Sequence, residues 1–131
     1  MTTMKRLSSL AFTLLLASVA CTQAQQDSIL PVADFEKQVA AAKEKVVLDV
    51  RTPDEYNRGH LPDAKLMNVN DRDFKQQLST LQKDKPVYVY CAAGVRSNKA
   101  ANIMRQEGFT QVFELKGGIQ SWQAAGKPVT K

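Results

Sequence analysis

Short apolar runs recur along the chain and are separated by longer mixed stretches. Four of these runs predict strands: Val46–Val50, Ala64–Val69, Pro86–Tyr90 and Gln111–Leu115. Ile29–Leu30 predicts a further short edge strand. The runs do not alternate cleanly between apolar and polar residues, which is expected of strands that are covered on both faces.

The stretches between the strands have helical periodicity. They predict helices over Asp34–Lys45, Asp71–Lys83 and Arg96–Gln106. A turn from Arg51 leads into a short helix with Thr52 as its cap and Pro53 at its first position, and a last short helix contains Trp122. Strands that alternate with helices predict an α/β domain, in which helices cover both sides of a parallel sheet.

The N-terminal residues have a different pattern from the rest of the chain. Lys5 and Arg6 precede an apolar run from Leu10 to Leu16, and small residues follow as far as Ala20. This order is typical of a secretory signal, and the run is shorter than the roughly 20 apolar residues that span a membrane. We therefore expect residues 1–20 to direct export to the periplasm, residues 21–28 to be a short linker and residues 29–131 to form one domain.

The site of cleavage has more than one interpretation. Small residues precede both Cys21 and Gln25, and each position fits an ordinary signal peptidase. The segment before Cys21 also resembles a bacterial lipoprotein signal, although Ser18 stands where that pattern usually has leucine. In that alternative, Cys21 carries a lipid anchor that tethers the domain to a membrane.

Charge excludes one class of partner. The whole chain has 18 basic and 13 acidic residues, a net charge of +5, and loss of Lys5 and Arg6 with the signal would leave +3. The basic residues are dispersed rather than clustered. We therefore expect no nucleic-acid partner.

Cys91 carries the strongest chemical signal in the sequence. It follows the predicted strand Pro86–Tyr90, and the small-residue loop that it opens leads directly into a helix. Free backbone N–H groups and the positive end of the helix favour the thiolate, which is the nucleophilic form. Cys21, the other cysteine of the chain, lies in or beside the signal, so a mature protein would leave Cys91 without an intramolecular partner.

A second predicted strand points to the same place. Asp49 and Arg51 lie at the end of Val46–Val50, and ligands of parallel sheets bind beyond the carboxyl ends of the strands. Glu55 lies one helical turn from Arg51, and we expect Asp49, Arg51 and Glu55 to form a charge network that braces the Cys91 loop rather than to take part in the chemistry. His60, in a Gly-His-Leu-Pro turn, and Trp122 are interpreted as structural residues, with a Cys–His catalytic pair as the alternative for His60.

Three motifs together resemble a known family. They are LDVRTPDEYNRGHLPDA from Leu48, CAAGVRS from Cys91 and GGIQSW from Gly117. Their order and spacing resemble the single-domain rhodaneses from about Ile29 to Pro128. This resemblance implies a rhodanese-like α/β fold around a five-stranded parallel sheet with helices on both faces.

The resemblance also implies a sulfurtransferase activity. Cys91 would take the outer sulfur of thiosulfate or a similar anionic donor as a persulfide and pass it to cyanide or a thiol. No metal or organic cofactor is required. The backbone of the loop would hold the donor and the persulfide, which assigns substrate binding to Ala92, Ala93, Gly94, Val95 and Arg96.

Two alternatives remain for this loop. Four residues separate Cys91 from Arg96, whereas the phosphatases that share the resemblance have five, so the shorter ring favours sulfur over phosphate or arsenate chemistry. The same loop also fits a persulfide carrier that serves a dedicated protein partner. The uncharged side chains of Ala92, Ala93 and Val95 leave the loop open to small donors and favour the enzyme.

Overall fold

The computed structural model describes residues 28–131. The predicted export signal, the lipid-anchor position Cys21 and all of the predicted linker except Ser28 lie outside the described residues. Within residues 28–131, no helix is both long and apolar enough to cross a membrane.

Five parallel strands form a single sheet in the order β1-β5-β4-β2-β3. The strands are β1 (Ile29–Leu30), β2 (Val46–Asp49), β3 (Lys65–Leu66), β4 (Val87–Tyr90) and β5 (Val112–Leu115). The predicted five-stranded parallel sheet is confirmed. Its central strand, β4, delivers the chain to Cys91.

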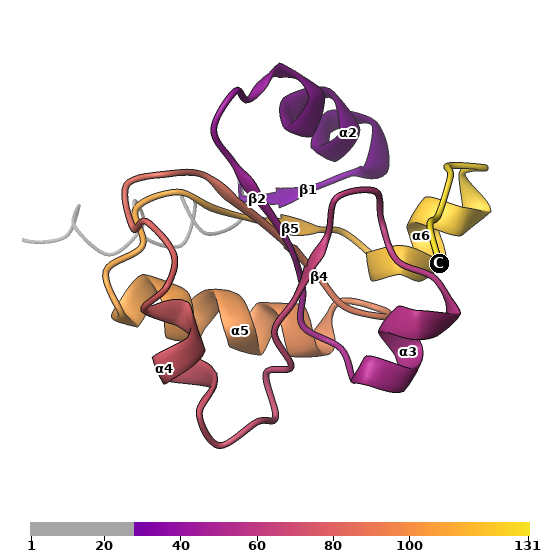
Figure 1. The fold of residues 1–131 in the computed structure, drawn as a ribbon. Coiled ribbons are helices and arrows are strands. Elements are labelled where there is room, and N and C mark those ends of the chain that lie inside the picture. Colours follow the sequence, from indigo (N-terminus) through magenta and orange to yellow (C-terminus); the bar gives the residue numbers. More distant parts are fainter. Residues whose placement is uncertain (1–27) are drawn as a thin grey trace, which may run out of the picture.

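Helices cover both faces of this sheet, as predicted (Figure 1). They are α2 (Val32–Ala41), α3 (Pro53–Arg58), α4 (Phe74–Leu78), α5 (Val95–Gln106) and α6 (Gly118–Ala124). α4 and α5 pack on one face, and α2 and α6 pack on the other. Each face therefore has its own hydrophobic core.

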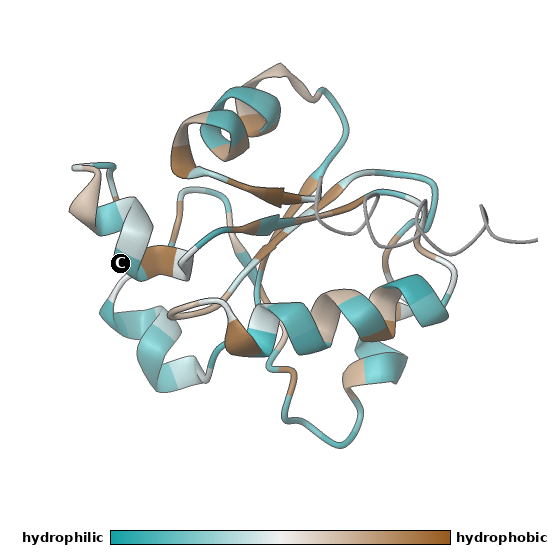
Figure 2. Ribbon diagram, turned by 180° about the vertical axis from the view of Figure 1, so that it is seen from behind, coloured by the Kyte–Doolittle hydropathy of each residue, from teal (hydrophilic) through white to brown (hydrophobic). Residues whose placement is uncertain are grey.

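The strands are largely apolar because successive side chains enter different cores. Leu48 and Val89 join the cluster under α4 and α5, whereas Val47 and Tyr88 join the cluster under α2 and α6. Hydrophobic segments accordingly follow the strands, and the helices carry long hydrophilic stretches (Figure 2). Burial on both sides explains why the sequence shows continuous runs instead of alternation.

The first predicted helix is wrong at both ends. Asp34–Lys45 was expected, but α2 begins at Val32 and ends at Ala41. Pro31 precedes the helix as its cap residue, and proline restricts the backbone in a way that suits a helix start. Ala42 is already extended, with φ −76° and ψ 122°, so that the chain can turn into β2.

Two other predicted elements are too long. The expected helix Asp71–Lys83 is reduced to α4, after which Ser79 and Thr80 bond through their hydroxyl groups to the carbonyls three residues earlier. Such local bonds compete with a continuing helix. The expected strand Ala64–Val69 pairs with β2 only at Lys65–Leu66, since β3 is an edge strand.

Candidate active site

Cys91 lies at the carboxyl end of the central strand, directly after β4. Its side chain is buried, with a residue exposure of 1%, and it belongs to the core under α5. The loop 91–94 then leads into α5 with Gly94 as the N-cap. The predicted strand–loop–helix setting of this cysteine is confirmed.

Hydrogen bonds converge on the sulfur of Cys91. The Gly94 amide donates to Sγ at 3.1 Å, and the thiol donates to Ser97 Oγ at 3.4 Å. Burial raises the pKa of the Cys91 thiol, but hydrogen bonding of the sulfur with the Ser97 hydroxyl and with the amides of Ser97, Gly94 and Ala93 outweighs it and leaves the pKa below its usual value. The site therefore favours the nucleophilic thiolate.

The start of α6 holds the loop in this orientation. The amides of Ile119 and Gln120 donate to the carbonyls of Cys91 and Ala92 at 2.9 and 3.1 Å. Gly118 makes this approach possible: a Cβ there would lie 2.5 Å from both of these carbonyl oxygens. With carbonyl groups turned toward α6, amides of the loop are left to face the sulfur.

The five predicted substrate-binding residues come together around Cys91, but their side chains differ in exposure. Ala92, Gly94 and Arg96 are half-buried, whereas Ala93 is exposed and Val95 is 82% exposed. Gly94 adopts φ +113°, a conformation that favours glycine. The loop thus presents backbone to the sulfur and apolar side chains to its surroundings.

Arg96 is held by Glu55 of α3. Its two terminal nitrogens donate to the two carboxylate oxygens at 2.7 and 2.8 Å. These bonds raise the pKa of Arg96, and they lower the pKa of Glu55 to about 2 against the opposing effect of burial. The guanidinium group is therefore committed to positioning the first turn of α5.

Asp49 and Arg51 brace a different segment from the one predicted. Arg51 donates to the Asp49 carboxylate at 2.7 Å and to the carbonyl of Gly59 at 2.8 Å. Tyr90 donates to Asp49 at 2.6 Å and accepts from the Leu61 amide at 3.0 Å. This buried network fixes the turn after α3, whereas Glu55, the third residue of the predicted network, braces the active-site loop through Arg96.

The register of the sheet creates this network. β2 and β4 pair so that Asp49 stands beside Tyr90. Burial raises the pKa of the Tyr90 hydroxyl, and the neighbouring Asp49 carboxylate raises it further. Tyr90 therefore stays protonated and serves as a hydrogen-bond donor.

His60 and Trp122 both have structural contacts. His60 Nδ1 lies 3.0 Å from the Tyr56 carbonyl, and its ring stacks on Tyr56 at 3.8 Å. The His60 amide pairs with Thr130, while the buried Trp122 donates to Pro128 at 2.9 Å. These contacts favour the structural interpretation of both residues.

Sequence reasoning missed two residues that shape the site. Ser97 contacts the sulfur, and Gly118 admits the loop against α6. They belong to the motifs CAAGVRS and GGIQSW, which were the available signal. Within residues 28–131, no group of three or more His, Cys, Asp or Glu side chains could hold a metal ion.

Comparison with protein-family models identifies the family of this chain. The rhodanese-like domain model matches residues 32–125. The chain is 36% identical over 97 residues to the uncharacterized protein YqhL of Bacillus subtilis, covering 74% of this chain and 75% of YqhL. It is 32% identical to a sulfurtransferase of Allochromatium vinosum (72% and 87% covered) and 31% identical to the thiosulfate sulfurtransferase GlpE of Shewanella oneidensis (67% and 85% covered).

Some relatives are larger proteins with another activity. The tRNA uridine(34) hydroxylase of Pelagibacter ubique is 40% identical over 81 residues, which cover 61% of this chain but only 27% of the hydroxylase. The similarity is thus to one part of that enzyme.

Solved structures agree on the fold. A rhodanese-related protein from Thermoplasma volcanium superposes with a TM-score of 0.68 at 32% identity and covers 77% of this chain and 95% of its own. The BH2092 protein from Bacillus halodurans reaches a TM-score of 0.71 at 26% identity, with 86% and 84% covered.

Proposed function

Because the chain belongs to the rhodanese family, we propose that it is a sulfurtransferase that carries a sulfane sulfur on Cys91. One observation carries the proposal. A buried thiol lies at the carboxyl end of the central strand, its pKa is lowered, and the backbone amide of Gly94 donates to its sulfur. Sulfurtransferases and a thiosulfate sulfurtransferase among the relatives support this reaction class. Thiosulfate is the proposed donor.

The reaction has two half-reactions. The Cys91 thiolate attacks the outer sulfur of thiosulfate, a new S–S bond forms, and the S–S bond of the donor breaks as sulfite leaves with the electron pair. Cyanide or a thiolate then attacks the outer sulfur of the persulfide, and Cys91 leaves as the thiolate. Covalent catalysis of this kind gives ping-pong kinetics.

The backbone amides and the Arg96 side chain of the loop have different roles in these two steps. Amides from Gly94 and its neighbours hold the sulfur and the negative charge that it carries. Arg96 acts as a positioning residue, because both of its terminal nitrogens are bound to Glu55. No metal or organic cofactor takes part in either step.

The small number of exposed large hydrophobic side chains favours an enzyme over a persulfide carrier that serves a dedicated protein partner. A docking surface calls for a sizeable apolar patch. Among the described residues, the exposed large hydrophobic side chains are Ile29, Val95 and Val129, at 36%, 82% and 36%. These three side chains offer little apolar area for a protein partner.

The direct test uses intact mass and turnover. The protein is incubated with thiosulfate, and a gain of one sulfur atom that Cys91→Ser lacks is expected; circular dichroism checks that the variant folds. Addition of cyanide should then release thiocyanate. A stable added sulfur with little turnover would favour the carrier, and no uptake from thiosulfate or polysulfide would contradict sulfur transfer.

We further propose that the protein works in the periplasm, on the strength of the pattern in residues 1–20. Expression of the whole chain in a bacterium, followed by fractionation and intact mass, tests this. A product shortened at Ala20 or Ala24 is expected in the periplasmic fraction. A membrane-bound product that Cys21→Ala releases would instead support lipidation, and an uncleaved cytosolic product would contradict export.

A further inference from the structure

Segment 127–130, which follows α6, is attached to that helix. The indole nitrogen of Trp122 donates to the carbonyl of Pro128 at 2.9 Å, and the Lys127 amide donates to the carbonyl of Trp122 at 3.2 Å. The Lys127 ammonium group also pairs with Glu36 of α2 at 2.6 Å. Figure 1 shows the segment in yellow beside α6 and close to α3. The segment therefore has a fixed position on the side of the sheet that α2 and α6 cover.

The same segment is also attached to the turn that ends α3. The backbones of Thr130 and His60 exchange two hydrogen bonds of 2.8 Å each, as an isolated antiparallel bridge. Val129 lies beside Gly59, the C-cap residue of α3, where an added Cβ would be 3.6 Å from the Val129 side chain. Segment 127–130 thus connects α6 to the C-terminal end of α3, although the two helices are far apart in the sequence.

These two helices are the ones that hold the active-site loop. The amides at the start of α6 donate to the carbonyls of Cys91 and Ala92 at 2.9 and 3.1 Å. Glu55 of α3 accepts from Arg96 at 2.7 and 2.8 Å. Arg96 precedes Ser97, whose hydroxyl lies 3.4 Å from Cys91 Sγ. A change in the distance between α3 and α6 would therefore act on both ends of the loop.

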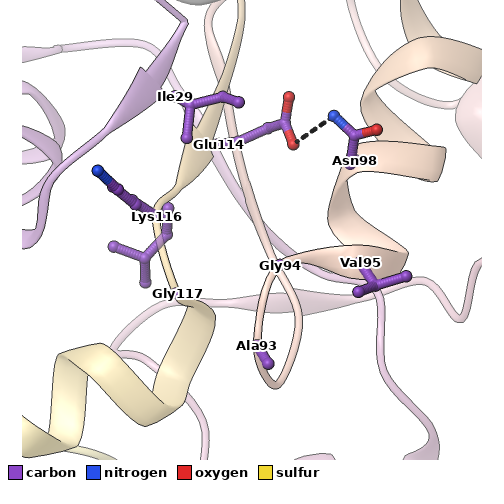
Figure 3. Close-up of a pocket in the computed structure, with 9 residues that line it drawn as sticks. Ile29, Ala93, Gly94, Val95, Asn98, Glu114, Lys116 and Gly117 are labelled. Carbon is purple, nitrogen blue, oxygen red and sulfur yellow. Dashed lines mark hydrogen bonds between the residues drawn. The ribbon is translucent and has the colours of Figure 1, made fainter.

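On another side, the loop borders a cavity of about 420 Å³ (Figure 3). Residues 93–95 line it from the loop, and residues 116–117 line it from the segment after β5. Gly94 belongs to this lining, and its amide donates to Cys91 Sγ at 3.1 Å. The cavity leaves this peptide group room to move, so the distance from the amide to the sulfur depends on the contacts of the loop with α3 and α6.

We propose that segment 127–130 positions the active-site loop. By joining α3 to α6, it keeps the loop around the sulfur of Cys91 and keeps the Gly94 amide within hydrogen-bond distance. The inference rests on the proposed function, in which Cys91 carries the sulfane sulfur. Segment 127–130 acts through α3 and α6, so its role is positioning and not catalysis.

Thr130→Pro tests this role, because proline lacks the N–H that donates to the His60 carbonyl. The Thr130 side chain is exposed, so the substitution removes no core packing. We expect weaker hydrogen bonds to Cys91 Sγ, a higher pKa of the thiol and about threefold slower alkylation by iodoacetamide at about pH 7. The pH dependence of the alkylation rate separates this effect from a loss of stability, which leaves the pKa of a folded thiol unchanged.

Hydrogen exchange provides a second readout at the loop itself. In Thr130→Pro, the amides of Gly94 and Ile119 should exchange about threefold faster than in the parent protein, because the loop and the start of α6 open more often. The amide of Val89, in the central strand, should exchange at the rate of the parent. This comparison distinguishes local loosening of the loop from a change in global stability.

Two variants are matched controls. Thr130→Ala keeps both backbone bonds of the bridge, and His60→Gln removes the imidazole but keeps the same backbone bonds. Both should retain the alkylation profile and the exchange rates of the parent. A Thr130→Pro protein that matches the parent in both readouts would overturn the inference, whatever its stability, and so would equal effects of Thr130→Pro and Thr130→Ala. Neither readout uses a sulfur donor, so sulfur uptake by the parent decides the proposed function separately.

Discussion

At the scale of single residues, the reactivity of Cys91 is a balance between opposite effects. Its thiol is almost fully buried, which raises its pKa and disfavours the charged form. The hydroxyl and amide of Ser97 and the amides of the loop lower it by more. The thiol is therefore activated by hydrogen bonds and not by exposure to water.

Ser97→Ala should shift this balance. With the hydroxyl gone, the pKa of Cys91 rises, because burial is then opposed by the backbone amides alone. A hydrogen bond to a charged group contributes roughly 1.5 kcal/mol, so alkylation by iodoacetamide should be about tenfold slower at about pH 7. The pH dependence of the alkylation rate measures the shift.

Ser79→Ala is the matched control for that experiment. Ser79 is exposed and its hydroxyl bonds to the Gln76 carbonyl, far along the chain from the site. Its alkylation profile should match that of the parent. A Ser97→Ala profile that also matches the parent would show that the amides alone set the pKa of Cys91.

His60→Gln tests the alternative of a Cys–His pair. The His60 side chain bonds to the Tyr56 carbonyl and stacks on the Tyr56 ring, so its loss should reduce the free energy of unfolding by about 1 kcal/mol and leave sulfur uptake by Cys91 nearly unchanged. Urea denaturation and intact mass after thiosulfate measure the two effects. A folded His60→Gln protein that takes up no sulfur would revive the Cys–His pair.

At the scale of elements, two helices fix the loop from different sides. α6 binds the carbonyls of Cys91 and Ala92, and α3 holds Arg96 through Glu55. Glu55 also closes the capping box of α3, since it accepts from the Thr52 amide at 3.0 Å. One carboxylate thus caps the N-terminus of α3 and positions the start of α5.

Gly118→Ala should displace the loop from α6. A Cβ at this position would meet backbone atoms at 2.5 Å, and backbone cannot rotate away as a side chain can. We expect a loss of about 3 kcal/mol in the free energy of unfolding and a large loss of sulfur transfer. Denaturant titration and the thiocyanate assay measure both.

Gly126→Ala separates the clash from the backbone conformation. Its φ of +73° is close to the +61° of Gly118, but a Cβ there would have no atom within 4 Å. Only the cost of the left-handed conformation remains, about 1 kcal/mol, with activity unchanged. Equal effects of the two substitutions would contradict the proposed role of Gly118.

At the scale of the whole molecule, the features that could be predicted from the sequence are those that depend on local patterns of residues. The strand before Cys91, the Thr52 cap and the parallel sheet followed from periodicity, turn chemistry and the three motifs. The pairings Glu55–Arg96 and Asp49–Tyr90 did not, because each joins residues 41 positions apart. They depend on strand register and helix placement, which no local pattern contains.

The cavity beside the loop is a second feature that only the fold reveals. Ile29, Val95 and Glu114 come from three separate segments, and nothing in their local sequence marks them as neighbours. The strand order brings them together, because β1 and β5 pair beside the strand that carries Cys91. Local motifs therefore identify the nucleophile, whereas the cavity beside it follows from topology.

The link between α3 and α5 should make stability depend on acidity. The pKa of Glu55 falls from 4.5 to about 2 on folding, chiefly through Arg96, so its contribution is fully present above 4.5 and is lost as the pH falls through about 2. The pair is partly exposed, and solvent screening limits this contribution to about 1 kcal/mol. Glu55→Gln should therefore be less stable than the parent near neutral pH, and the difference should vanish at the acid end of a series of urea titrations.

The control for acid stability is Asp54→Asn, which removes a neighbouring charge from the same first turn of α3. Both substitutions weaken the interaction with the helix dipole, but only Glu55→Gln removes the partner of Arg96. Glutamine can still close the capping box, so the difference between the two variants isolates the ion pair. If Asp54→Asn loses as much acid-dependent stability as Glu55→Gln, the helix dipole and not the link to the active-site loop governs the acid response.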